Sequence, residues 1–278
     1  MNSVLKPIHR SNLRQLIGKE FFILKRKLNW LFGEANWTRQ EKYTIDGYSV
    51  FKHQSMILRP LKDVDIYLQE NKRTNLRLAV EKLNNTVINP EETFSLWKQV
   101  GRPTKAKGYL EGLVLNQGSI VKGTGGGLCQ LGNLLFWIFA HSPLSIIERH
   151  RHGFDVFPDV NRNVPFGAGA TLSYNYIDLQ IKNHTTNQFQ IKLWMDEVFL
   201  YGELVSAQKP TSTFRIEESG HHMNLQYWGG YTRHNQIIKI ETDEYGVEKS
   251  VLLVENHAIM MYSPFLEEGK LQSTPSIK

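Results

Sequence analysis

GTGGGLCQLGNLLFWIFAHSP spans residues 123–143 and decides how the middle of this chain folds. Its second half is almost entirely apolar, which predicts a buried helix over residues 129–140 that ends at Ser142 and Pro143. Three consecutive glycines precede that helix, and Cys129, the one cysteine of the chain, stands at its first turn. The question is therefore why the chain places its one thiol where a flexible loop meets a buried helix.

Composition bounds the class of protein. The 278 residues are 41% hydrophobic and 22% charged, which fits a soluble chain with one substantial core, or one core plus a smaller module. A single cysteine excludes an intrachain disulfide framework and a zinc site built from several cysteines. The formal charge of +6 is too small to indicate nucleic acid, so we expect no nucleic-acid partner.

The fold class predicted is α+β. The apolar helix carrying the cysteine at its N-terminus is expected to pack on a mainly antiparallel sheet, followed by a β-rich C-terminal region. Further strands are predicted over residues 145–152, 171–181 and 189–193, and a helix over residues 71–83. We expect a helical segment at residues 1–42, a core domain at 43–207 and a β-rich extension at 208–278.

The N-terminal segment is basic and amphipathic. Its longest uninterrupted apolar run, Phe21 to Leu24, is shorter than a secretory or membrane-spanning segment needs, so we expect a cytoplasmic protein. Two interpretations stay open for the helix. It either packs on the surface of the domain, or it makes a peripheral contact with anionic lipid at the inner face of the membrane.

The glycine loop and the cysteine together indicate nucleophilic chemistry. Gly126 and Gly127 let a ligand approach the main chain closely, and the N–H groups at the start of a helix lower the pKa of a thiol there. The same N–H groups are suited to an oxyanion hole for acyl transfer. The alternative is that Cys129 is a small buried apolar residue.

A base for Cys129 is expected from residues 145–159, SIIERHRHGFDVFPD. In a strand, His150, His152 and Glu148 would share one face. Either ring is a candidate base, with His152 preferred because Asp155 is placed to orient it. These two histidines, Asp155 and Cys129 also leave a mixed zinc site open, but no HExxH motif is present, and we expect no metal and no cofactor.

Several stretches of the chain together resemble the VanW family. They are NKRTNLRLAVEKLNNTVINPEETFSLWKQVGRPTKAKGYLEG (71–112), GGGLCQL (125–131), IIERHRHGFDVFPD (146–159) and VPFGAGATLSYNYIDLQIKN (164–183). Some multidomain members are regarded as L,D-transpeptidases that cross-link peptidoglycan stem peptides through a cysteine of this domain. Many members also carry an acidic residue at the position of Gly169.

The resemblance implies that Cys129 is the nucleophile and that His150 and His152 match the histidine pair of the family, while the catalytic role expected of Asp155 rests on its place after His152. The resemblance also implies a substrate site that includes Arg149, which would bind a carboxylate as a bidentate fork. The remaining residues expected in that substrate site are Gly126, Gly127, Gln130 and Tyr109.

The leading hypothesis is therefore cysteine-dependent acyl transfer on a peptidoglycan-type peptide through a thioester. The alternative is a non-catalytic module that binds a cell-wall precursor or a glycopeptide at the membrane surface, in a groove lined by Tyr109, Arg149 and the histidines.

Overall fold

The computed structural model describes residues 11–39, 43–58, 65–116, 119–156 and 164–264. Helices and short strands fill the first half, and long antiparallel strands follow, which confirms the α+β class with a β-rich C-terminal region. The helices are α1 (Asn12–Phe32), α2 (Ile66–Leu83), α3 (Leu96–Val100) and α4 (Cys129–Ala140), with a 3-10 turn η1 (Lys105–Lys107). The strands of the first part are β1 (Tyr48–Met56), β2 (Thr86–Ile88), β3 (Thr93–Ser95), β4 (Glu111–Asn116), β5 (Ser119–Thr124), β6 (Ser145–Glu148) and β7 (Phe154–Asp155). Those of the second part are β8 (Gln180–Lys182), β9 (Phe189–Met195), β10 (Phe199–Ser206), β11 (Thr213–Leu225), β12 (Tyr231–Thr242) and β13 (Glu248–Met260).

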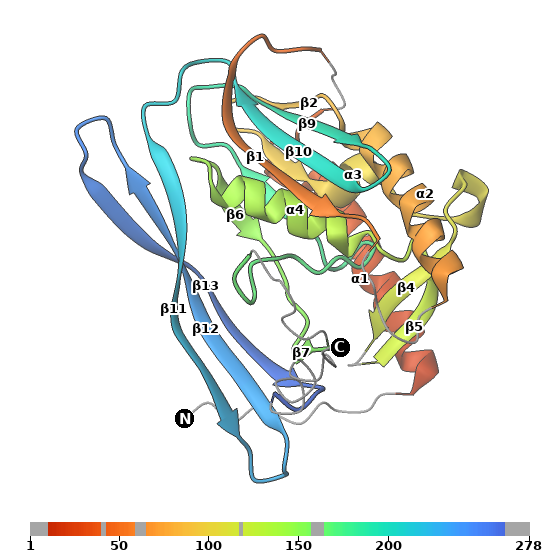
Figure 1. Cartoon of the computed structure of the whole chain (residues 1–278). Coiled ribbons are helices and arrows are strands. Elements are labelled where there is room, and N and C mark those ends of the chain that lie inside the picture. Colours follow the sequence, from red (N-terminus) through yellow and green to blue (C-terminus); the bar gives the residue numbers. More distant parts are fainter. Residues whose placement is uncertain (1–10, 40–42, 59–64, 117–118, 157–163, 265–278) are drawn as a thin grey trace, which may run out of the picture.

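The central helix α4 packs against a four-stranded antiparallel sheet of order β1-β10-β9-β2 (Figure 1). Leu131, Leu135 and Phe136 are fully buried, and a helix that is apolar on every side must be enclosed in this way. The helix approaches β10 at Gly202, where an added Cβ would lie 2.6 Å from Cδ1 of Ile138. The absence of a side chain at that strand position therefore lets helix and sheet pack closely.

Helix α4 begins and ends where the sequence predicts. Past its last residue, the Ser142 hydroxyl donates to the carbonyl oxygen of Phe139 over 2.8 Å, and Pro143 lacks the N–H that another turn would need. Helix α2 begins at Ile66, several residues before the predicted start of that helix.

Two predicted strands are much shorter than expected. β6 ends at Glu148 instead of reaching His152, and over residues 171–181 only Gln180 and Ile181 belong to a strand, β8. In the part of the chain that the structure describes, β8 lies between β3 and β6, and β6 pairs with β8 alone. Beyond Glu148 no described strand supplies ladder hydrogen bonds, so alternation in the sequence does not produce a strand there.

The C-terminal strands form a second sheet of order β11-β12-β13-β7, seen as a long twisted ribbon along one side of the molecule in Figure 1. Its last strand, β13, runs parallel to β7, with Ile259 opposite Phe154. The C-terminal extension is thereby hydrogen bonded to the segment that follows the histidines. The domain boundaries predicted at residues 42 and 207 stay a prediction. In the described ranges, no helix combines the length and the hydropathy needed to cross a membrane.

Candidate functional site

Cys129 is the first residue of α4, and its sulfur is half-buried against the core. The Leu172 N–H donates to Sγ over 3.4 Å, and Sγ lies 3.8 Å from the Leu172 carbonyl oxygen. Burial raises the pKa of the Cys129 thiol, and hydrogen bonds from backbone N–H groups offset this only in part. The predicted lowering of the thiol pKa is therefore wrong, because loss of hydration outweighs the helix N-terminus.

The glycine loop before Cys129 uses its amides to hold the β4–β5 hairpin. The Gly125 N–H donates to the Leu110 oxygen over 2.9 Å, and the Gly127 N–H donates to the Leu113 oxygen over 3.1 Å. An added Cβ at Gly126 would lie 2.2 Å from the carbonyl carbon of Gly112, so the two backbones cross in contact. The amides of Gly125 and Gly127 thus have partners inside the protein, and the oxyanion hole expected from the N–H groups at the start of α4 stays a prediction.

Two other residues predicted to bind substrate, Gln130 and Tyr109, are held within the protein. The Gln130 side-chain amide donates to Ser55 Oγ over 2.9 Å and to the Met56 oxygen over 2.8 Å, which ties the start of α4 to β1. Tyr109 is only 3% exposed, and burial raises the pKa of its hydroxyl to about 12. The expectation that Tyr109 lines an open groove is therefore wrong.

The two histidines lie on an irregular segment after β6. His150 is exposed, and its Nε2 lies 3.8 Å from a carboxylate oxygen of Glu148. The N–H of His152 donates to Thr171 Oγ1 over 2.9 Å, and burial followed by the Arg151 charge lowers the pKa of the His152 imidazole. The Thr171 N–H donates in turn to the carbonyl oxygen of His150 over 2.8 Å, so the main chain of both histidines is held against the segment that carries Thr171.

One short segment, residues 170–172, lies between the thiol and His152. Leu172 binds the sulfur of Cys129 through its N–H, and the preceding residue, Thr171, binds the main chain of His152. The fold therefore brings Cys129 and His152 to neighbouring residues of one segment. Among the described residues, no hydrogen bond joins either histidine ring directly to the sulfur.

Arg149 clamps the loop at residues 167–169 against the C-terminal sheet. Its guanidinium donates to the carbonyl oxygens of Gly167 and Gly169 and to Oδ1 of Asn256, and it lies over the ring of Phe136. Burial lowers the pKa of Arg149 to about 10. These bonds already occupy Nε and Nη2 of Arg149. The expectation that its guanidinium binds a substrate carboxylate through two hydrogen bonds therefore stays a prediction.

The space beside Gly169 is occupied by a side chain from α4. A Cβ at Gly169 would lie 2.4 Å from Oδ1 of Asn133, the oxygen that accepts the Ala170 N–H over 2.9 Å. In this chain an acidic side chain at residue 169 would therefore displace Asn133.

Asp155 is buried, and its carboxylate has partners other than His152. The Tyr262 hydroxyl donates to Oδ2 over 2.9 Å, and Arg233 Nη1 lies 3.5 Å from the same oxygen. Within the described ranges no hydrogen bond joins Asp155 to His152, so the expected orienting role is not seen. In the same ranges, no three His, Cys, Asp or Glu side chains form a group able to hold a metal ion.

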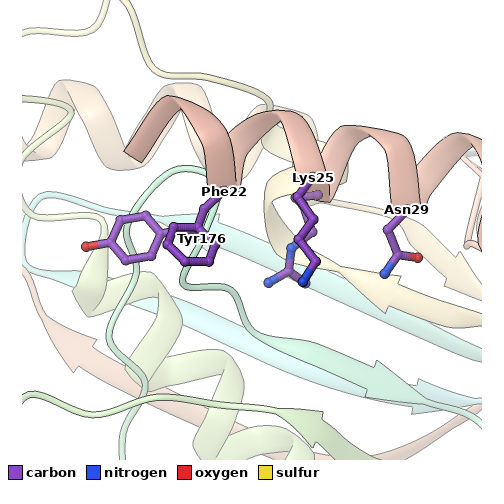
Figure 2. A pocket seen from close by; sticks show the side chains of 5 residues that line it. Phe22, Lys25, Asn29 and Tyr176 are labelled. Carbon is purple, nitrogen blue, oxygen red and sulfur yellow. The ribbon is translucent and has the colours of Figure 1, made fainter. Parts of the chain in front are cut away.

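A cavity of about 260 Å³ lies between α1 and the turn at residues 173–177 (Figure 2). It is lined by Phe22, Lys25, Arg26, Asn29 and Tyr176. The Arg26 guanidinium is bound to both carboxylate oxygens of Glu148 at 2.5 and 2.6 Å. Sequence reasoning missed this site, because the turn holding Tyr176 was predicted as a strand and nothing local pairs it with α1.

The central part of the chain is similar to a known protein family. Residues 71–205 match the family described as VanW like protein. This part of the chain belongs to the VanW family. The VanW region runs from within α2 to the end of β10, so it includes Cys129 and the histidine segment but not α1.

Two relatives illustrate the range of similarity. The Vancomycin B-type resistance protein VanW of Enterococcus faecalis (strain ATCC 700802 / V583) is 37% identical over 169 residues, which are 61% of this chain and 62% of that protein. The uncharacterized protein YoaR of Bacillus subtilis (strain 168) is 31% identical over 121 residues, 42% of this chain and 37% of that protein. The matches thus cover less than two thirds of either relative's length. No solved structure matches the chain.

Proposed function

We propose that this VanW-family protein transfers acyl groups on peptidoglycan-type peptides, with a thioester on Cys129 and His152 as the base. The observation that carries the proposal is the segment at residues 170–172, which binds the thiol through Leu172 and the main chain of His152 through Thr171. The family resemblance supports the peptide class of substrate.

The chemistry begins from neutral partners. Because burial raises the pKa of Cys129 and lowers that of His152, both the thiol and the imidazole are uncharged near neutral pH. The imidazole takes the thiol proton as sulfur attacks an amide carbonyl, and the imidazolium then protonates the departing amine. An acceptor amine, or water, attacks the thioester, passes a proton to the imidazole and releases the thiol.

Intact-protein mass spectrometry after incubation with muropeptides tests this proposal. We expect an acyl adduct on the wild-type protein, and none on Cys129→Ser. His152→Gln should slow adduct formation by about 100-fold or more, as expected for loss of a general base. His150→Gln is the matched control, because that ring is exposed and turned to Glu148, and it should retain the wild-type rate.

Two results would contradict the proposal. The first is the absence of any adduct on folded wild-type protein across muropeptides that differ in stem-peptide sequence. The second is an equal loss of rate in the two histidine variants, with thermal melting used to show that both are folded.

A second candidate is a module that binds a cell-wall precursor without chemistry. The raised pKa of the Cys129 thiol favours it, and so do the amides of Gly125 and Gly127, which are bonded within the protein. In that case, radiolabelled lipid-linked precursor should bind the wild type and Cys129→Ala equally, and neither protein should form an adduct. Binding lost in Cys129→Ala would contradict this second candidate.

A further inference from the structure

The outer side of α1 carries a continuous apolar stripe. Its residues recur at every third or fourth position and are 45–74% exposed, although they are large and apolar. They are Leu13, Ile17, Phe21, Leu24, Leu28 and Leu31. A stripe of this kind on a helix normally faces a core, and here it faces outward.

The opposite side of α1 is already bound to the body of the protein. Ile23 is 3% exposed, and the Arg26 guanidinium forms its two-point ion pair with Glu148. Because a helix turns by about 100° per residue, Arg26 lies roughly opposite the centre of the apolar stripe. The helix therefore cannot bury its stripe against this domain by rotating without breaking that ion pair.

Cations border the stripe along both edges. Lys25 follows Leu24 on one edge, and Lys27 precedes Leu28 on the other. Neither lysine has an ion-pair partner among the residues that the structure describes, whereas Glu20, the acidic residue of α1, is bound to Arg102 at 2.9 Å. The exposed face thus combines apolar surface with uncompensated positive charge.

The cavity beside α1 includes the lysine of one edge. Lys25 lines it together with Asn29 and Tyr176, and Figure 2 shows Lys25 and Asn29 projecting from α1 on the side where Phe22 lies beside Tyr176. An ammonium and an amide are suitable donors for a phosphate oxygen. The cavity therefore offers donors for an anionic group, and Lys25 joins it to the edge of the apolar stripe.

We propose that α1 is an interfacial helix that lies flat on an anionic lipid bilayer, with its apolar stripe among the acyl chains and its lysines at the level of the phosphates. Apolar burial flanked by lysines is the pattern that binds such surfaces. A second copy of the chain would cover the stripe but would bring the lysines of two helices together. This inference is independent of the acyl-transfer proposal.

Co-sedimentation of the full-length protein with vesicles tests it. We expect binding to vesicles of phosphatidylglycerol and phosphatidylcholine, and much weaker binding to phosphatidylcholine alone. The double variant Phe21→Glu/Leu24→Glu should lower the partition coefficient by about 100-fold, because two apolar side chains that would enter the bilayer are replaced by negative charges that anionic lipid repels. Lys25→Gln/Lys27→Gln should reduce binding about tenfold and weaken its salt dependence.

The matched control is Val251→Glu/Leu252→Glu, which places two charges on exposed apolar positions of β13 and should leave binding unchanged. Circular dichroism shows whether each variant is folded. The proposal is overturned if the folded wild type ignores anionic vesicles, or if the α1 variant and the β13 variant bind equally well. It is also overturned if light scattering shows a lipid-free dimer that Phe21→Glu/Leu24→Glu converts to a monomer, since a second copy then covers the stripe.

Discussion

Two side chains flank the segment at residues 170–172, and burial acts on them in opposite directions. It raises the pKa of the Cys129 thiol and lowers the pKa of the His152 imidazole, so the uncharged form of each is favoured. A preformed thiolate–imidazolium pair is therefore not the resting state. In the acyl transfer that we propose, the nucleophile would be generated when His152 removes the thiol proton during attack.

Alkylation of Cys129 tests this resting state. The rate of reaction with iodoacetamide should follow the thiolate fraction, and its midpoint in folded protein should lie above that of an ordinary thiol, which is about 8.5. The same chain unfolded in urea serves as the control, because its thiol is hydrated and should titrate normally. A midpoint in the folded protein below the unfolded value would mean that the helix N-terminus dominates after all.

At the level of helices and strands, the start of α4 is fixed where the loop before it crosses strand β4, with a glycine of each segment at the contact. Gly126 lies against Gly112 of β4, and the Asn75 side-chain amide of α2 donates to the Gly126 oxygen over 2.9 Å. Helix α2, the β4–β5 hairpin and α4 meet at this point. The glycine loop therefore determines where the thiol stands relative to the rest of the domain.

Replacing Gly126 with alanine tests this contact. The new Cβ would lie 2.2 Å from backbone of Gly112, so we expect the free energy of unfolding to fall by about 3 kcal/mol. Gly153→Ala is the control, because nothing lies within 4 Å of its added Cβ, and its effect should stay within about 0.5 kcal/mol. Urea denaturation measures both, and similar stabilities of the two variants would contradict the assigned role of Gly126.

The bounds of helices and strands show how much of the secondary structure can be predicted from the sequence. The bounds of α4 follow from an apolar run closed by Ser142 and Pro143, and both signals are local. The strand predicted over residues 145–152 is half as long as expected, because β6 pairs with the short β8 and no described strand continues the ladder. A strand needs a partner, and the sequence of one segment does not provide it.

Across the whole molecule, burial shifts the pKa of four buried or half-buried histidines in the same direction. Burial lowers the pKa of His53, His141, His152 and His234. His234 also belongs to a row across the C-terminal sheet, since it stacks on His222 and its Nδ1 lies 2.6 Å from Nδ1 of His257. That contact needs one neutral ring as acceptor, so protonation of both rings breaks it.

These shifts predict how stability depends on pH. The unfolded histidines titrate near about 6.5, and the folded ones titrate lower, so the unfolded state binds more protons as the pH falls below about 6.5. Stability should therefore fall from pH 7 to 5, by up to about 1.4 kcal/mol per pH unit for each extra proton bound. Thermal melting across this range is the measurement, and His234→Gln should flatten the curve.

Asp178 acts in the opposite direction. Burial raises its pKa to about 6, so the folded state binds a proton before the unfolded state does, and stability is gained as the pH falls through about 6. Below about pH 6, the free energy of unfolding should therefore fall more steeply with falling pH in Asp178→Asn than in the wild type. This difference in slope is expected even if the variant is less stable at every pH. A shallower slope in Asp178→Asn would contradict this assignment.

The sequence by itself determines the α+β class, the position and ends of α4, the thiol at its first residue and the amphipathic pattern of α1. These features follow from apolar periodicity and turn residues, which are properties of neighbouring positions along the chain. Only the tertiary structure decides that burial raises the pKa of Cys129, that main-chain hydrogen bonds hold His150 and His152 against Thr171, and that Tyr176 lines a cavity against α1. The reason is that hydration and hydrogen-bond partners depend on atoms that folding brings together from distant parts of the chain.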